Sequence, residues 1–195
     1  MTGGGNLGYR GVPEMWETGM AKSNTETSIE LYRLVDDGEI PNNETLPLIV
    51  YRGALPPGAD PAGAFEALFA RNGWSGGWRN GIYPYHHYHS TAHEVLGIAK
   101  GEARARFGGD KGETVAVRAG DVVVVPAGVG HKNESASADL LVIGAYPDGR
   151  GPDLCTGKSD ERPRVLANIA KVPLPEADPV SGQTGPLIDA WGARH

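Results

Sequence analysis

The segment Gly81–Gly101, GIYPYHHYHSTAHEVLGIAKG, decides the fold more than any other part of the chain. Its period is about two residues, which is typical of β-strands. His87 and His89 are two residues apart, so on a strand their side chains leave the same face. Small residues follow them and can turn the chain, and a returning strand would bring Glu94 beside the two imidazoles.

A third imidazole comes from outside this segment. His131 follows the turn 126–130, PAGVG. Imidazole nitrogens with a carboxylate oxygen suit iron, manganese, nickel, copper or zinc, whereas calcium and magnesium prefer shells of oxygen alone. A His-x-His pair by itself is a weak signal, because most strand histidines are structural. With Glu94 and His131 added, the pattern indicates that four side chains can surround one ion.

Short apolar runs continue on both sides of the histidines. The chain has 29 glycines and 15 prolines, and most of them separate these runs. Many short strands joined by tight turns are typical of an antiparallel sandwich or barrel. The predicted strands are 28–37, 46–55, 83–89, 94–100, 103–107, 114–118, 122–125, 131–134 and 140–146.

One helix is predicted over residues 60–73. Asp60 suits the N-cap, and Pro61 suits the first helical position. A short apolar stripe at i, i+3 and i+4 indicates that this helix lies against a sheet. The stripe consists of Phe65, Leu68 and Phe69.

The chain divides into three parts. Residues 1–26 are rich in Gly, Asn, Thr and Ser without an apolar period, and we expect a flexible N-terminal arm. Residues 27–150 are predicted to form a single β domain that includes the helix. Residues 151–195 are polar and proline-rich, and we expect them to wrap around that domain.

These residues resemble the first motif of the cupin superfamily. That motif runs Gly, five residues, His-x-His, three or four residues, Glu, six residues and Gly. Every position is matched here. The matching residues are Gly81, His87, His89, Glu94 and Gly101.

The second cupin motif runs Gly, five residues, Pro-x-Gly, two residues and His, and it is also present. Its residues here are Gly120, Pro126, Gly128 and His131. In the family pattern, three residues separate this His from an Asn. Here only one residue separates His131 from Asn133, so no family role is carried over to Asn133.

Residues within and beside the two motifs resemble one particular group of cupins. Residues 71–97 and 144–149 look similar to a bacterial YjlB-like group of single-domain cupins. The resemblance implies a mostly β, antiparallel jelly-roll (cupin) barrel with one short helix and extended terminal segments.

For the site, the resemblance implies that His87, His89, Glu94 and His131 are metal ligands and leave about two adjacent coordination positions open. We therefore expect one divalent transition metal per chain, with Fe or Mn favoured and Ni, Zn or Cu as alternatives. The expected function is a metal-dependent enzyme that acts on a small organic carboxylate or carbonyl compound. A dioxygenase is the first choice, and a lyase or isomerase the second. The alternative is a non-catalytic cupin that binds or senses a small ligand or a metal.

Side chains alternate between the two faces of a strand, so the residues beside the ligands can be assigned to the ligand face or to the opposite one. His86 and His93 are predicted to point away from the ligands, as structural histidines rather than acid–base groups at the cavity mouth. Four residues share the parity of the ligands and are predicted to line the pocket. They are Tyr85, Thr91, Leu96 and Ile98.

Charge and composition exclude several classes of protein. The net charge of −6 argues against a nucleic-acid or anionic-membrane partner, because both require a basic surface. A single cysteine, Cys155, excludes an internal disulfide framework. The longest aliphatic run, Val122–Val125, is far too short to span a membrane. We expect a cytoplasmic protein, and the strand at 28–35, outside both motifs, suggests a homodimer.

Overall fold

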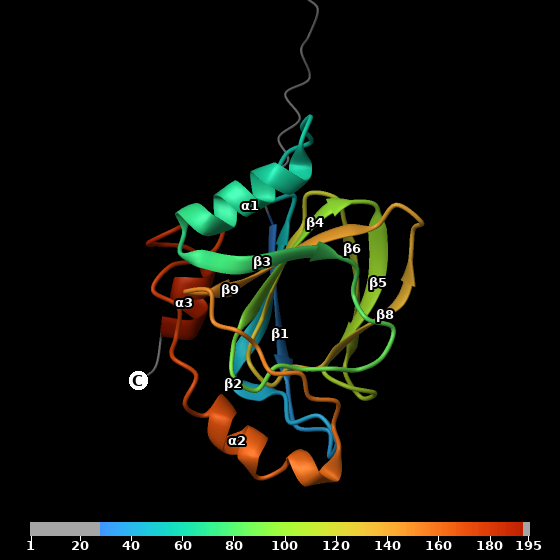
Figure 1. Cartoon of the computed structure of the whole chain (residues 1–195), viewed down its shortest axis with the longest axis vertical. Coiled ribbons are helices and arrows are strands. Elements are labelled where there is room, and N and C mark those ends of the chain that lie inside the picture. Colours follow the sequence, from blue (N-terminus) through green and yellow to red (C-terminus); the bar gives the residue numbers. More distant parts are fainter. Residues whose placement is uncertain (1–27, 193–195) are drawn as a thin grey trace, which may run out of the picture.

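The computed structural model describes residues 28–192, so the arm predicted over 1–26 lies outside the described residues. Within this range, nine strands form two antiparallel sheets (Figure 1). The larger sheet has the order β1-β2-β7-β4-β9-β3, and the smaller one has the order β6-β5-β8. The strands are β1 (Ser28–Leu34), β2 (Asn43–Arg52), β3 (Trp74–Asn80), β4 (Glu94–Lys100), β5 (Glu102–Phe107), β6 (Glu113–Arg118), β7 (Val122–Val125), β8 (His131–Ala136) and β9 (Leu141–Pro147).

The chain passes repeatedly from one sheet to the other after β4, as it does in a jelly roll. The mostly β, antiparallel fold predicted from the sequence is therefore confirmed. Strand β7 is a continuous run of valines because both of its faces are buried. Val122 and Val124 pack on the outer face of the larger sheet, which two helices, α1 (Pro61–Arg71) and α3 (Pro186–Gly192), cover. Val123 and Val125 point into the core between the two sheets.

The predicted helix is α1 (Pro61–Arg71), and it lies on the outer face of the larger sheet (Figure 1). The Asp60 carboxylate caps it by accepting the Gly63 N–H at 3.0 Å. Phe65 and Phe69 meet the sheet at Gly97 of β4, where a Cβ would lie 2.7 Å from the Phe65 ring. Glycine at this position therefore lets the helix approach the sheet closely.

The structure differs from the sequence prediction in the presence of two strands. Strand β3 was not predicted, because WSGGWRN has no alternation of apolar and polar residues and contains two glycines. The strand predicted over 83–89 is reduced to single β-bridges at His87 and Tyr88. Pro84 has no N–H to donate, and Tyr88 pairs with Cys155 of the C-terminal segment rather than with a neighbouring strand.

The C-terminal segment contains short helices, whereas the sequence predicted one helix in the whole chain. Beyond residue 150 the described elements are a 3₁₀ turn (Ser159–Glu161), α2 (Arg164–Ile169) and α3 (Pro186–Gly192). These helices are too short to produce a clear apolar period. Trp191 of α3 is nonetheless fully buried, and its indole N–H donates to the Pro47 carbonyl at 2.9 Å. No helix within residues 28–192 is long and apolar enough to cross a membrane.

Candidate metal centre

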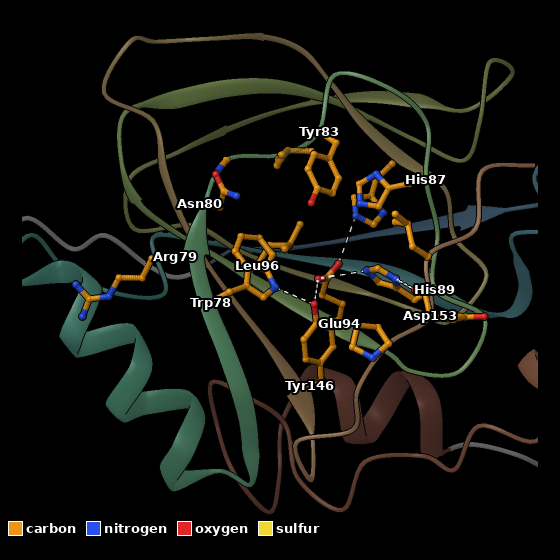
Figure 2. A pocket seen from close by; sticks show the side chains of 15 residues that line it. Trp78, Arg79, Asn80, Tyr83, His87, His89, Glu94, Leu96, Tyr146 and Asp153 are labelled. Atoms are coloured by element: carbon orange, nitrogen blue, oxygen red, sulfur yellow. Dashed lines mark hydrogen bonds and ion pairs between the residues drawn. The ribbon is translucent and has the colours of Figure 1, made fainter.

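The three predicted histidine ligands meet between the two sheets. His131 is the first residue of β8, and its backbone forms a two-way bridge with His87, with N···O distances of 2.9 and 3.2 Å. His89 lies two residues further along the extended segment. The candidate ligand nitrogens of these three residues all lie within 4.8 Å of one another. Figure 2 shows the labelled His87 and His89 on one side of the cavity, with Glu94 facing them.

Each of the three imidazole rings is oriented through its Nδ1 atom. This atom faces a backbone carbonyl oxygen in every case, which suits a ring that carries its proton on Nδ1. Such a ring keeps the lone pair on Nε2, which is then available to a metal ion. The pairs are His87 with Tyr85 (3.4 Å), His131 with Val129 (3.3 Å) and His89 with Asp153.

Glu94 lies at the start of β4 and is only 2% exposed. Its Oε1 atom accepts a hydrogen bond from the Tyr146 hydroxyl at 2.9 Å and lies 3.6 Å from Nε2 of His89. Its Oε2 atom lies 3.3 Å from Nε2 of His131 but accepts no hydrogen bond from a described residue. A buried carboxylate oxygen without a donor is costly unless a cation or a proton meets it. The donor set, three imidazoles and one carboxylate, therefore fits a divalent transition metal.

At His87 and Glu94, the electrostatics of the cluster favour the protonation states that metal ligands need. Burial, together with the neighbouring rings of His131 and His89, lowers the pKa of His87 to about 3, so this imidazole is neutral at neutral pH. Burial opposes the charge of Glu94, but its contacts with His131 and His89 outweigh this effect and hold its pKa well below the usual range. Burial also lowers the pKa of His89, but the contact with Glu94 outweighs burial and raises it overall.

A cavity of about 340 Å³ opens beside the cluster. The three histidines and Glu94 form its base, and Leu96 of β4 contributes to its wall. Strand β3, which the sequence did not predict, supplies another part of the wall through Trp78. The C-terminal segment closes a third side with Pro152, Asp153 and Leu154.

Tyr146 of β9 bonds the same Glu94 oxygen, Oε1, that His89 approaches. Its hydroxyl accepts a hydrogen bond from the Trp78 indole N–H at 2.8 Å and donates its own proton to Glu94 (Figure 2). Trp78 lies against Gly144, where an added Cβ would be 2.1 Å from the indole ring. Burial and the negative charge of Glu94 raise the pKa of Tyr146, which keeps the phenol protonated as a donor. Sequence analysis did not identify this chain of contacts.

Asp153 links the C-terminal segment to the candidate metal ligands. Its backbone carbonyl faces His89, while its carboxylate accepts the Ser90 N–H at 2.6 Å and contacts the Thr91 hydroxyl at 3.2 Å. One residue therefore fixes both the His89 ring and the turn that follows it. Sequence analysis missed Asp153, because it lies far from the histidines along the chain.

The residues predicted to line the pocket are only partly correct. Leu96 lines the cavity, but Ile98 lies in the core between the sheets. Thr91 faces Asp153, and the Tyr85 ring stacks on Tyr83 outside the cavity wall. These three expectations were wrong because the chain does not keep a strict strand alternation between residues 83 and 93, and because Ile98 is covered by the core between the sheets.

His86 and His93 lie outside the cavity, as parity predicted. Nε2 of His86 is 3.3 Å from the carboxylate of Asp110, which lies in the turn between β5 and β6. His93 accepts the Ala127 N–H at 2.9 Å through its Nδ1, and its ring packs on Trp191. Asn133 does not line the cavity either.

Comparison with known proteins identifies close and distant relatives. A family model described as a cupin domain matches residues 79–144. The uncharacterized protein YjlB of Bacillus subtilis (strain 168) is 45% identical over 166 residues, which cover 85% of this chain and 98% of that protein.

Solved structures show weaker likeness. Acireductone dioxygenase from Bacillus anthracis is 20% identical, with a TM-score of 0.34, over 47% of this chain and 62% of that one. Oxalate decarboxylase from Bacillus subtilis, a protein with Mn(II) centres, is 19% identical, with a TM-score of 0.33, over 60% of this chain. The match spans 29% of the decarboxylase chain, less than a third of its length.

Proposed function

This chain is a member of the cupin family that contains Bacillus subtilis YjlB, and from this premise we propose that it is a metal-dependent enzyme for a small organic substrate. The proposal assigns His87, His89, His131 and Glu94 as ligands of one divalent metal, with Fe or Mn as the first choices. The observation that carries it is the convergence of three imidazoles, with ligand atoms within 4.8 Å, at the base of an open cavity.

Bound there, a divalent ion would supply Lewis-acid or redox chemistry to a chelating carboxylate or carbonyl compound. The protein's own residues set the conditions for it. The backbone carbonyls beside each Nδ1 keep the Nε2 atoms available. Tyr146 orients the Glu94 carboxylate, and the cavity admits a small molecule to the ligands. A dioxygenase is our leading reaction type.

Elemental analysis of untagged protein, purified without a nickel column, tests the metal assignment. We expect about one Fe or Mn per chain in the wild type. His89→Ala and Glu94→Ala should each lose most of the metal and keep the wild-type circular dichroism spectrum. His86→Ala is the matched control, because this neighbouring imidazole faces Asp110 outside the cavity. Full metal content in both ligand variants would refute the assignment.

Oxygen uptake by the Fe(II)-loaded protein tests the reaction type. A screen of small hydroxy acids and dicarbonyl compounds should give uptake that the His89→Ala variant lacks. Metal bound at full stoichiometry without turnover, for Fe(II), Mn(II) and Ni(II) alike, would instead support the non-catalytic binding function.

A further inference from the structure

Most of the large apolar side chains that are exposed within residues 28–192 lie either at β1 or around the mouth of the cavity. Seven such residues occur, and three of them, Tyr83, Tyr85 and Leu154, belong to the region around the cavity mouth. They are 45%, 45% and 55% exposed. Exposed apolar groups around a concave site mark a surface that a ligand covers. We propose that this site selects substrates with a singly charged chelating head and an uncharged aromatic or apolar body; this inference rests on the proposed metal site.

The wall beside the metal ligands is shaped for a flat apolar group. Trp78, Leu96 and Ile82 line the cavity, and Tyr83 stands at its edge. The Tyr83 and Tyr85 rings stack with centroids 5.1 Å apart and an interplanar angle of 10°. Figure 2 shows the Tyr83 hydroxyl directed into the cavity. A ligand body that fills this space would replace water with aromatic and aliphatic contacts.

The cavity offers no free cation to a second carboxylate. Arg79 is the one arginine or lysine among the described residues that line it. Its guanidinium makes two hydrogen bonds of 2.7 Å to the Glu66 carboxylate, and Figure 2 shows it pointing away from the cavity. The Asp153 carboxylate at the wall has partners of its own, because it accepts the Ser90 N–H, contacts the Thr91 hydroxyl and has Arg164 at 3.8 Å outside the lining. A second carboxylate on the substrate would therefore lack a cationic partner in a partly desolvated site.

The charge of the ligand set leads to the same class of substrate. Metal-bound imidazoles are neutral, so Glu94 would be the one anionic ligand. A divalent ion would then leave one positive charge, which a singly charged head such as a hydroxy-carboxylate balances. A second carboxylate on the substrate would leave the site with excess negative charge.

Three acids that share one head test this selection. Mandelate, lactate and malate all carry a hydroxyl and a carboxylate on the same carbon. Mandelate adds a phenyl ring, lactate a methyl group and malate a second carboxylate. Calorimetry with Mn(II)-loaded protein should give a dissociation constant for mandelate about tenfold or more below those for lactate and malate, since burial of a phenyl ring is worth at least this factor.

Variants at the mouth of the cavity test which residues produce the selectivity among the three acids. Tyr83→Ala should bring the affinity for mandelate several-fold closer to that for lactate without changing the metal content. Leu154→Arg, at a position exposed enough to accept a charge, should strengthen malate binding several-fold. Lys100→Gln is the control and should change neither affinity, because this exposed residue at the end of β4 does not line the cavity.

The outcomes separate this inference from the proposed function. Malate binding as tight as mandelate, or failure of all three acids to bind metal-loaded protein, overturns the substrate class and leaves the metal site standing. Metal content is measured on the same samples, and its absence overturns the proposed function. The apolar wall belongs to the chain itself, so saturation-transfer NMR on metal-free protein should still rank mandelate first, and any other ranking refutes the subsite.

Discussion

Tyr146 shows how one hydroxyl can serve two neighbouring groups, the buried Glu94 and the half-buried Trp78. It gives Glu94 a hydrogen bond and takes one from Trp78, so its loss would leave both partners incomplete. Groups that orient metal ligands typically change metal affinity about 10- to 100-fold when removed. A buried acceptor such as the Glu94 carboxylate, left without its donor, costs about 1–3 kcal/mol.

We therefore predict that Tyr146→Phe lowers the affinity for Mn(II) by about 10-fold or more and the unfolding free energy by about 1–3 kcal/mol. Titration against a competing chelator and denaturant unfolding measure the two effects. Tyr88→Phe is the control, because that hydroxyl bonds Glu161 at 2.7 Å and does not contact the cluster. An equal loss of metal affinity in both variants would contradict the orienting role.

At the scale of elements, the Arg52 side chain at the end of β2 adds polar contacts to both sides of this strand. Its guanidinium bonds Glu30 of β1 twice, at 2.8 Å each, and the buried Asp121 before β7 at 2.9 Å. The hydrogen bonds from Arg52 and then from Tyr32 lower the pKa of Glu30 from 4.5 to about 2, against the opposing effect of burial.

A lowered folded-state pKa means that the Glu30 pairing stabilises the protein above pH 4.5 and ceases to do so as the pH falls toward 2. The melting temperature of Glu30→Gln should therefore lie below that of the wild type by a constant amount between pH 5 and 8. The difference should shrink below pH 4.5, as measured by thermal unfolding. Glu44→Gln, at an exposed position of β2, is the control. A difference that does not vary with pH would contradict the ion pair.

At the scale of the whole molecule, β1 forms one edge of the larger sheet and has β2 as its only strand neighbour within residues 28–192. It exposes Ile29 and Leu31, at 38% and 54%, on the face that α1 and α3 cover elsewhere. An apolar edge strand of this kind is suited to pairing with another chain.

We predict that a second copy covers this edge, so that light scattering gives twice the 20.6 kDa mass of one chain. Leu31→Glu should shift the protein to the monomer mass, whereas Leu166→Glu on α2, also an exposed leucine, should not. A monomeric wild type would contradict the homodimer.

The sequence predicted the parts of this structure that local patterns determine. Strands β4 to β9 could be predicted because each is a short segment separated from the next by turn residues, and His87, His89 and Glu94 meet because a short turn joins their segments. Tyr146 and Asp153 could not be predicted, since their contacts with Glu94 and His89 span 52 and 64 residues. Such long-range contacts leave no local trace in the sequence.

The Asp153 carbonyl beside His89 has a consequence for the order of events during synthesis. All four proposed ligands leave the ribosome before Asp153 does, because His131 is the last of them. Until residue 153 emerges, the nascent chain has the ligands but lacks the contact that orients the His89 ring and fixes the turn after it. Chains fold from the N-terminus as they are made. Stable capture of the ion should therefore be a late step of biosynthesis, after the strands have already assembled.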